Sequence, residues 1–520
     1  MFPAQTSFIP VTVAIVKYIE AHGFLGDYPF WYLGTTPVKY LVGPVVPTIL
    51  IALHEFLPNF SLFDISYFLI LASFIISAVG WGMFARRISG NRSVGWWVGL
   101  LSLVLPWRFF STMAFGEVSA VLASALTPWV LLVFESTFAL SQSKNARPSI
   151  FLDSIYNFRL AQDSVGTTSF NLIRLFLNHA AGFIMFLIRA KPAVLSALIF
   201  AILLLTNTTA SIPAIVGIFI LAIVTSRRWE DGVKRAGLVV LAGGFLTLLW
   251  YGVGYWVSVF FKTPSIGGKT AAGVLVSLLN SLRAFLPVTL AIVLVRFKFK
   301  PKNLYEKFVF SWLGVFVSIT LFRFVADVDF WMDWTSWMGE IEIGIVLLVS
   351  KFFSQSFAFK TASKTKRTFV LFLLTYLIVG WWLVWTNRGF WMPRKSVEGT
   401  VEYILAKELE RIVGPGETVF LSGSSTFWLN SLVDVAQVRG GRDEVAQNEN
   451  WRKVVWEVRG GVGKNRSVES LKLLGVDFLV VHGDNSSEYY HDFENPQGFE
   501  GLDSLEKVYD DAQDRIYKIK

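Results

Sequence analysis

The chain has 520 residues, of which 53% are hydrophobic, with 47 Phe and 20 Trp, and its mean hydropathy is +0.52. This composition excludes an ordinary soluble domain and indicates a polytopic membrane protein that lies in a lipid bilayer. The net charge of +9 does not indicate a nucleic-acid partner, because the Lys and Arg residues stand in short clusters between apolar runs, as in cytoplasmic loops. The absence of cysteine excludes disulfides, thiolate metal sites and cysteine nucleophiles.

The first 61 residues contain no clear membrane span. The apolar run at residues 8–19 is too short to span, so we expect an amphipathic helix on the membrane surface. The next stretch, which includes WYLGTTPVKYLVGPVVPTIL, is rich in aromatic residues and is interrupted by prolines. A proline-broken segment at membrane depth must lie against protein or a cavity. Residues 38–56 are therefore predicted to form a re-entrant or interfacial helix within an external segment, residues 1–61.

Residues 62–387 contain the predicted spans. Clusters of Lys and Arg follow alternate apolar runs, which places those loops in the cytoplasm and both chain ends outside. The interrupted segment 170–188 is predicted to be a helix on the cytoplasmic surface, and Asn207 to Thr209 form an external turn. The ten predicted spans of this multi-pass protein are 62–84, 94–110, 114–134, 192–206, 210–225, 236–260, 271–295, 308–323, 338–352 and 368–387.

After residue 395 the composition changes. Residues 396–520 alternate a helical pattern, VEYILAKELERIV, with strand-like runs, TVFLSG, FLVVHG and RIYKIK, and with Gly-rich turns. This predicts a small α/β domain that buries its own core. The fold class is thus mainly α: a helical membrane domain, residues 1–395, followed by a small extracytoplasmic α/β domain. Because turns explain the polar residues at its strand ends, we expect a lid or an interaction domain without chemistry.

Acidic residues occur at two places on the predicted outer face. Glu117 opens the apolar run GEVSAVLASALTP, and a carboxylate there is costly unless it faces a partner or a water-filled cavity. The alternative is that Glu117 caps the helix, since an acid in the first turn suits the helix dipole. The segment DVDFWMDWTSWMGEIE contains Asp327, Asp329 and Asp333. Its tryptophans suit sugar recognition or, alternatively, belong to an interfacial aromatic belt.

Basic residues are predicted on the same outer face. They are Arg108, Lys262 and Arg323. Arg and Lys side chains bind phosphate or diphosphate groups. The acidic residues could act as general bases or hold a divalent cation, Mg²⁺ or Mn²⁺. Together these residues predict a mixed-charge cavity for a phosphate-bearing ligand.

Several motifs resemble those of a known family. They are WYLGTTP before the proline-broken helix, the span that ends in ARRISG, and LPWRFFSTMAFGEVSAVLASALTP, in which a span ending in proline precedes a Gly-Glu helix. The pattern resembles GT-C-type membrane proteins, most closely the group labelled 6-pyruvoyl-tetrahydropterin-synthase-related membrane proteins, with YfhO-like proteins as relatives. The run GVDFLVV and the final RIY also resemble the external domain that ends those chains.

The resemblance implies a glycosyltransferase of the cell membrane with an external active site. It implies a polyprenyl-phosphate-linked sugar donor, an inverting transfer and an acidic base just after the first span, and Glu117 matches the Gly-Glu position. Near the start, Ala4, Gln5 and Thr6 stand where the family has an acid, and no span precedes residue 38. We therefore expect either an N-terminally truncated or a degenerate enzyme. A non-catalytic transporter or assembly protein for lipid-linked glycans is the alternative.

Overall fold

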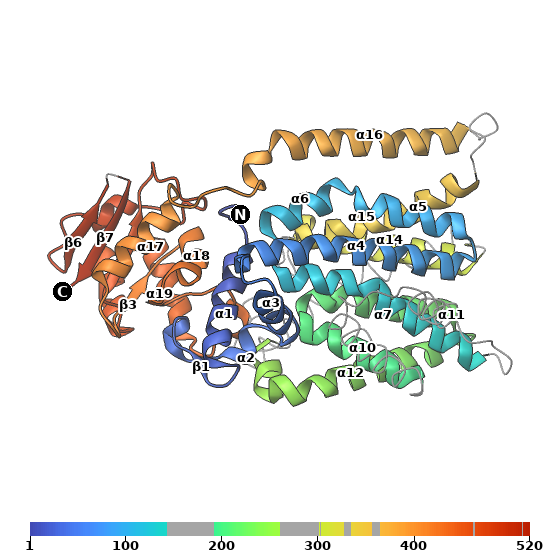
Figure 1. Ribbon diagram of the computed structural model, residues 1–520, viewed down its shortest axis with the longest axis horizontal. Coiled ribbons are helices and arrows are strands. Elements are labelled where there is room, and N and C mark those ends of the chain that lie inside the picture. The colour runs from blue at the N-terminus through green and yellow to red at the C-terminus, as the bar shows by residue number, and fades with distance from the viewer. Residues whose placement is uncertain are drawn as a thin grey trace.

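The computed structural model describes residues 1–142, 192–259, 301, 303–326, 334–355, 364–460, 463–511 and 513–520. A long helical bundle carries a smaller α/β unit at one end (Figure 1). Within the described ranges, four helices are long and apolar enough to span a membrane, and a bent helix pair raises this number to five. The chain is a membrane protein. The ten spans stay a prediction, and the span expected at 271–295 lies outside the described residues.

The bundle is built from apolar helices, because a helix satisfies every backbone hydrogen-bonding group within its own segment. Two short 3₁₀ turns, η3 (Thr209–Ser211) and η7 (Arg388–Phe390), follow α10 and α16. The bundle helices are α4 (Leu62–Ser89), α5 (Arg92–Leu103), α6 (Pro106–Phe115), α7 (Val118–Gln142), α10 (Pro192–Thr206), α11 (Ile212–Thr225), α12 (Trp229–Val257), α14 (Leu304–Ala326), α15 (Trp334–Gln355) and α16 (Lys364–Thr386).

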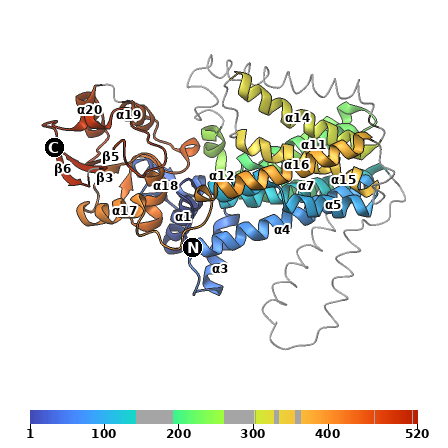
Figure 2. The same ribbon diagram turned by 90° about the horizontal axis from the view of Figure 1, so that it is seen from above.

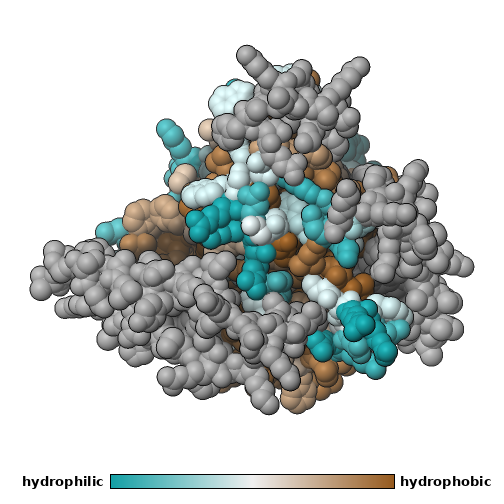
Figure 3. Space-filling view, turned by 90° about the vertical axis from the view of Figure 1, so that its right-hand side faces the viewer, coloured by the Kyte–Doolittle hydropathy of each residue, from teal (hydrophilic) through white to brown (hydrophobic). Residues whose placement is uncertain are grey.

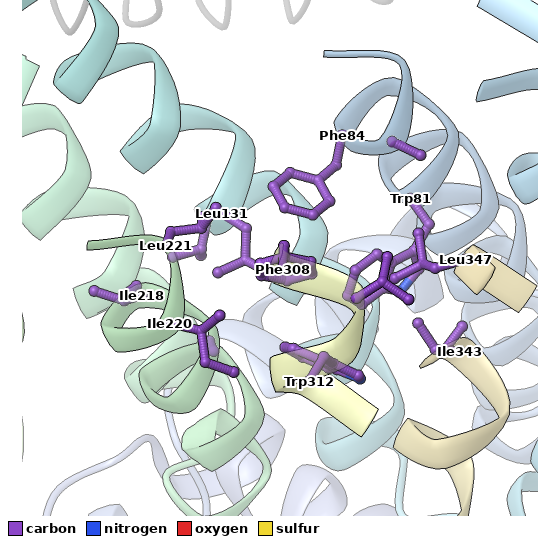
Figure 4. Close-up of a cluster of buried hydrophobic side chains, with 14 of the residues drawn as sticks. Trp81, Phe84, Leu131, Ile218, Ile220, Leu221, Phe308, Trp312, Ile343 and Leu347 are labelled. Atoms are coloured by element: carbon purple, nitrogen blue, oxygen red, sulfur yellow. The ribbon is translucent and has the colours of Figure 1, made fainter. Parts of the chain in front are cut away.

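Large aromatic and aliphatic side chains fill the centre of the bundle. Trp81 and Phe84 of α4 meet Phe308 and Trp312 of α14, with Leu131 of α7 beside them (Figure 4). The rings of Trp81 and Trp312 cross edge to face with centroids 5.4 Å apart. Such contacts hold α4, α7 and α14 together where lipid offers no hydrophobic drive for helix association.

One predicted span is broken in the structure. The span expected at 94–110 consists of α5 and α6, which meet at an angle of 42°. Pro106 is the first residue of α6. Proline has no backbone N–H to donate and disfavours helical geometry in the residue before it, so the helix ends and restarts at this point.

The N-terminal segment lies between the bundle and the α/β unit, as Figures 1 and 2 both show. Every residue of α1 (Ile9–His22) from Ile9 to Val16 is buried, because α18 packs on one side and α3 and α4 on another. The helix predicted at residues 8–19 is therefore present, and protein covers it on more than one side. The rest of the segment comprises β1 (Asp27–Tyr28), η1 (Tyr32–Gly34), β2 (Thr36–Pro37), α2 (Val38–Leu41) and α3 (Val45–Phe56).

Gly43 lies in the short link between α2 and α3. A Cβ atom at Gly43 would lie 1.8 Å from the carbonyl oxygen of Leu205 in α10, so only glycine allows this approach. The proline-broken segment predicted from the sequence thus rests directly on the bundle.

The α/β unit contains a five-stranded mixed sheet in the order β4-β3-β5-β7-β6. Strand β3 runs parallel to β4 and β5, whereas β7 runs antiparallel to β5 and β6. The predicted helix and the three predicted strands are confirmed. The elements are α17 (Val401–Ile412), β3 (Thr418–Phe420), α18 (Ser424–Leu432), β4 (Ala436–Gln437), η8 (Asp443–Val445), α19 (Asn450–Arg459), α20 (Lys464–Leu473), β5 (Phe478–His482), η9 (Pro496–Phe499), β6 (Leu505–Asp510) and β7 (Asp514–Ile519).

The far end of the bundle carries basic residues. Arg86 and Arg87 lie at the end of α4, and Arg87 Nε donates to Glu135 Oε2 of α7 at 2.7 Å. Figure 3 views this end and shows hydrophilic side chains among apolar ones. Basic residues at one end of a bundle are expected of cytoplasmic loops. That the α/β unit is extracytoplasmic stays a prediction.

Candidate active site between the bundle and the α/β unit

Glu117 lies at the end of the bundle that faces the α/β unit. Its carbonyl oxygen accepts the backbone N–H of Val121 at 3.0 Å, so Glu117 immediately precedes the first turn of α7. Helix α7 begins, and α10 and α12 end, at this same end of the bundle (Figure 1). The side chain of Glu117 is 21% exposed, so solvent reaches the carboxylate.

Side chains hold one oxygen of the Glu117 carboxylate. Oε1 accepts hydrogen bonds from Arg442 Nη2 and Ser119 Oγ, and from Asn207 Nδ2 at 3.3 Å. Asn207 Nδ2 also donates to Ser119 Oγ at 3.0 Å. Within the described parts of the chain, no group donates to Oε2. The carboxylate is therefore fixed through Oε1 and open at Oε2, instead of bonding the backbone N–H groups of α7 as a helix cap would.

The partner of Glu117 comes from the α/β unit. Arg442 stands in the loop RGGRDE, which leads from β4 into η8. A Cβ atom at Gly440 would lie 2.5 Å from the ring of Trp31, and one at Gly441 would lie 2.5 Å from Val11. The two glycines let the loop pass against the N-terminal segment at a distance that no side chain permits.

Tyr32 fixes the backbone at Arg442. The Tyr32 hydroxyl accepts the N–H of Arg442 at 2.8 Å and donates to Asp443 Oδ1 at 3.0 Å. Burial raises the pKa of Tyr32 well above its ordinary value, and the nearby Asp443 raises it further. The hydroxyl therefore stays protonated, so it can accept the N–H of Arg442 and also donate to Asp443. The aromatic motif WYLG thus positions the arginine that reaches Glu117.

The Arg442 guanidinium is shared between two carboxylates. Nη1 lies 3.1 Å from Glu444 Oε1, while Nη2 bonds Glu117. The side chain is 13% exposed. Burial lowers the pKa of Arg442, but Glu117 and then Glu444 raise it by more, so the guanidinium stays charged. A charged, pre-aligned arginine of this kind is suited to binding anions through paired N–H donors.

Further polar contacts join the two parts beside this ion pair. Gln447 Nε2 donates to Ser258 Oγ at 2.7 Å, and the Gln447 N–H donates to Thr36 Oγ1 at 3.2 Å. In the bundle, the hydroxyls of Thr208 and Tyr255 lie 2.7 Å apart. The α/β unit therefore contributes directly to the polar surface around Glu117, although the sequence predicts a domain without chemistry.

Arg108, a predicted phosphate-binding residue, points into the bundle. Its Nη2 donates to Ser77 Oγ of α4 at 2.7 Å and to Ser124 Oγ of α7 at 3.5 Å. Its backbone N–H donates to Glu342 Oε2 of α15 at 2.8 Å. Among the described residues, Nη1 is buried without a partner, and Arg108 makes no hydrogen bond to Glu117. The phosphate-binding role of Arg108 stays a prediction.

The remaining predicted site residues are not placed. Asp327, Asp329, Asp333 and Lys262 lie outside the described residues, and the side chain of Arg323 in α14 is not described. In the described parts of the chain, no group of three or more His, Cys, Asp or Glu residues could hold a metal ion. The donors around Glu117 are an arginine, an amide and a hydroxyl, which do not fit a cation. That Asp327, Asp329 or Asp333 holds a Mg²⁺ or Mn²⁺ ion therefore stays a prediction.

The sequence alone does not show the roles of Arg442, Ser119 and Asn207. Arg442 and Glu117 are 325 positions apart, and one arginine among 47 basic residues does not show its partner. Its local signal is the pair of glycines in RGGRDE, because paired glycines between charged residues indicate a close backbone approach. The signal for Asn207 is its place in a turn that ends an apolar helix.

No protein-family model and no curated protein sequence matches the chain. Solved structures of similar fold include the archaeal oligosaccharyltransferase AglB from Archaeoglobus fulgidus in complex with an inhibitory peptide and a dolichol-phosphate, with a TM-score of 0.50 and 11% identity. The same enzyme tethered to an acceptor peptide containing the NVT sequon gives a TM-score of 0.51 and 10% identity, and its apo form gives 0.50 and 11%.

The chain has a GT-C-type fold. The similarity covers 92–93% of this chain, so the fold class implied by the sequence motifs is confirmed. The chain spans only 65–66% of the length of the AglB chains. At this low identity the likeness concerns the GT-C-type fold alone, and the narrower resemblance to the 6-pyruvoyl-tetrahydropterin-synthase-related and YfhO-like groups stays a prediction.

Proposed function

We propose that the chain is a GT-C-like glycosyltransferase that moves a sugar from a polyprenyl-phosphate carrier to an extracytoplasmic acceptor. The observation that carries the proposal is the hydrogen bonding of the two carboxylate oxygens of Glu117. A general base needs a fixed orientation and an oxygen that can take a proton. Glu117 has Oε1 held by three donors and Oε2 open among the described residues.

In the proposed reaction, Glu117 Oε2 takes the proton of the acceptor while the acceptor atom attacks the anomeric carbon. The bond between that carbon and the carrier phosphate oxygen breaks, and the phosphate leaves as an anion. Such a base contributes about 10²–10⁴-fold to the rate. The complex of AglB with a dolichol-phosphate supports a lipid phosphate as the class of carrier.

The predicted site residues whose side chains are not described keep the roles that the sequence predicts. Asp327, Asp329 or Asp333 would act as a second acid or would hold a divalent cation, whose positive charge stabilises a leaving phosphate. Lys262 and Arg323 would contact the carrier phosphate. No step of the proposed reaction depends on these placements.

The test compares two acidic residues at opposite ends of α7. The protein in lipid nanodiscs receives a polyprenyl phosphate that carries a radiolabelled hexose, together with an extract of the native membrane as acceptor. Glu117→Gln should lower transfer by about 10²–10⁴-fold, since the base is lost. Glu135→Gln is the matched control, because Glu135 also pairs with an arginine, Arg87, but at the far end of the bundle. It should leave transfer within a few fold of wild type.

Equal transfer by the wild type and the Glu117→Gln variant would contradict the catalytic assignment. The non-catalytic alternative gives a different result in the same preparation. Reconstituted into vesicles, the protein would then move the labelled lipid across the membrane with its glycosidic bond unchanged.

A further inference from the structure

The ion pair between Glu117 and Arg442 opposes the proposed role of Glu117 as a general base. Its Oε1 bonds the charged guanidinium of Arg442, and both side chains are largely buried, with 21% and 13% exposed. A carboxylate neutralised by an arginine is a weaker proton acceptor than one facing like charge. Breaking such a pair without a substitute leaves a largely buried charge unpaired, which is strongly unfavourable. The pair therefore needs another anion to open.

The position and chemistry of Arg442 select a phosphate as that anion. A guanidinium presents its N–H donors in a planar fork that matches phosphate oxygens. Glu117 and Asn207 stand where α7 begins and α10 ends, and the ends of apolar helices lie at the level of lipid headgroups. The amide of Asn207 donates to Glu117 Oε1 at 3.3 Å, and the hydroxyl of Ser119 donates to the same oxygen. A lipid-linked phosphate at this depth would meet the Arg442 guanidinium, while Asn207 and Ser119 keep Oε1 of Glu117 oriented.

We propose that the phosphate of the lipid carrier displaces Glu117 from Arg442, so that binding of the donor releases the base. The identity of the lipid carrier rests on the proposed function. Only the contacts of Nη2 change in this step, because Nη1 of Arg442 remains beside Glu444 and its backbone N–H remains on Tyr32. The guanidinium stays in place while Nη2 passes from carboxylate to phosphate.

The exchange has two chemical consequences. Before the donor binds, Arg442 Nη2 occupies Oε1 of Glu117 and forms an ion pair with the carboxylate. After the donor binds, the phosphate stands next to a carboxylate that has lost its arginine, and a nearby like charge makes a carboxylate a better proton acceptor. The α/β unit thereby couples occupation of the donor site to activation of the base.

The proposed displacement predicts that removing the charge of Glu117 strengthens the binding of a lipid phosphate. If Glu117 and the phosphate compete for one guanidinium, Glu117→Gln should bind a lipid phosphate more tightly than the wild type, by about tenfold. Arg442→Ala should bind it at least about tenfold more weakly than the wild type. Arg442→Lys, which keeps the charge without the fork, should also bind it more weakly than the wild type, but less so than Arg442→Ala. Arg411→Ala is the control, because Arg411 is an exposed arginine of the same unit that pairs with Glu408.

The measurement is binding of farnesyl phosphate, without sugar, to the full chain in nanodiscs, followed by ³¹P NMR or calorimetry. Size-exclusion profiles and thermal midpoints check that each variant is folded. If Arg442→Ala does not fold, the opposite shifts of Glu117→Gln and Arg442→Lys still decide. Inorganic phosphate is the second arm and should compete only weakly. Equal competition by inorganic phosphate would overturn the lipid source.

Unchanged or weaker binding by Glu117→Gln would overturn the displacement, as would unchanged binding by Arg442→Ala. Failure of the proposed function is distinguishable, since no sugar is transferred in this assay. If the variants show this binding pattern but the protein transfers no sugar, the phosphate site is supported and the transferase function is contradicted. Transfer that depends on Glu117, without tighter binding by Glu117→Gln, would keep the transferase and remove the displacement.

Discussion

The two faces of the sheet in the α/β unit are buried in different ways. On the far face, Val419, Val480 and Ile516 pack against α17, which precedes β3 in the same unit. On the junction face, Leu479 and Val481 belong to an apolar cluster that continues into the N-terminal segment and the end of α12. Alternate residues of β5 thus face alternate partners, as the two-residue period of a strand requires.

The difference separates local from long-range determinants of the fold. The far face needs only strand alternation and an amphipathic helix nearby in sequence. The junction face needs segments hundreds of positions apart to fit: Trp31 against Gly440, Val11 against Gly441 and Glu117 against Arg442. The proposed active site depends on the long-range contacts of the junction face, since the proposed base, Glu117, meets its charged partner, Arg442, at that face.

Replacing one core residue on each face should give the largest effects. Trp31→Ala removes a fully buried ring from the junction and its hydrogen bond to Asn430 at 2.8 Å, at a cost of about 3–5 kcal/mol. Leu409→Ala removes a fully buried side chain from the far face and should cost about 2–5 kcal/mol. Both variants should lower the thermal midpoint measured by circular dichroism.

Only the junction variant should loosen the α/β unit from the bundle. The chain contains no cysteine, so spin labels at Arg92→Cys in α5 and Lys472→Cys in α20 report one distance between the two parts. The distance distribution should broaden in Trp31→Ala and stay narrow in Leu409→Ala. Broadening of equal size in both would show that the two faces do not act independently.

A smaller change at the junction tests the close approach itself. Gly440→Ala places a Cβ atom 2.5 Å from Trp31, which is fully buried. Overpacking of this kind costs about 1–3 kcal/mol, and the strain should also displace Arg442, two positions along. Gly399→Ala is the matched control, because nothing lies within 4 Å of its Cβ. A Gly440→Ala variant as stable as Gly399→Ala would show that the loop approaches less closely.

The far face and the bundle helices were predictable because their signals are local. The run VEYILAKELERIV has the period of a helix with one apolar side, and FLVVHG is a short apolar run bounded by a turn. Glu117 was also found locally, as a costly charge at the head of an apolar helix. Its partner, Arg442, could not be found in this way, because Arg442 is positioned only when the RGGRDE loop packs against the WYLG motif.

The smallest effect concerns the interior of the α/β unit and should not depend on the junction. His482 Nδ1 lies 2.7 Å from Asp514 Oδ1, with both side chains almost fully buried. Burial lowers the pKa of His482, but the hydrogen bond to Asp514 and the charges of Asp514 and Glu488 raise it by more, so the folded-state pKa lies above the ordinary value.

A raised histidine pKa means that the charged form stabilises the fold. This stability is fully present below the unfolded-state pKa of about 6.5 and is lost as the pH rises through the higher folded-state pKa. Each pH unit that separates the two pKa values corresponds to about 1.4 kcal/mol of unfolding free energy. Thermal midpoints of the wild type should therefore fall from pH 6 upward over this window, and those of His482→Gln should change less.

The same pH-dependent fall should appear in Trp31→Ala, because the histidine pair lies within the α/β unit and its energy adds to that of a distant substitution. Thermal midpoints of Trp31→Ala, measured over the same pH series, check this. A fall that disappears in Trp31→Ala would instead show that the interior of the unit depends on its contact with the bundle.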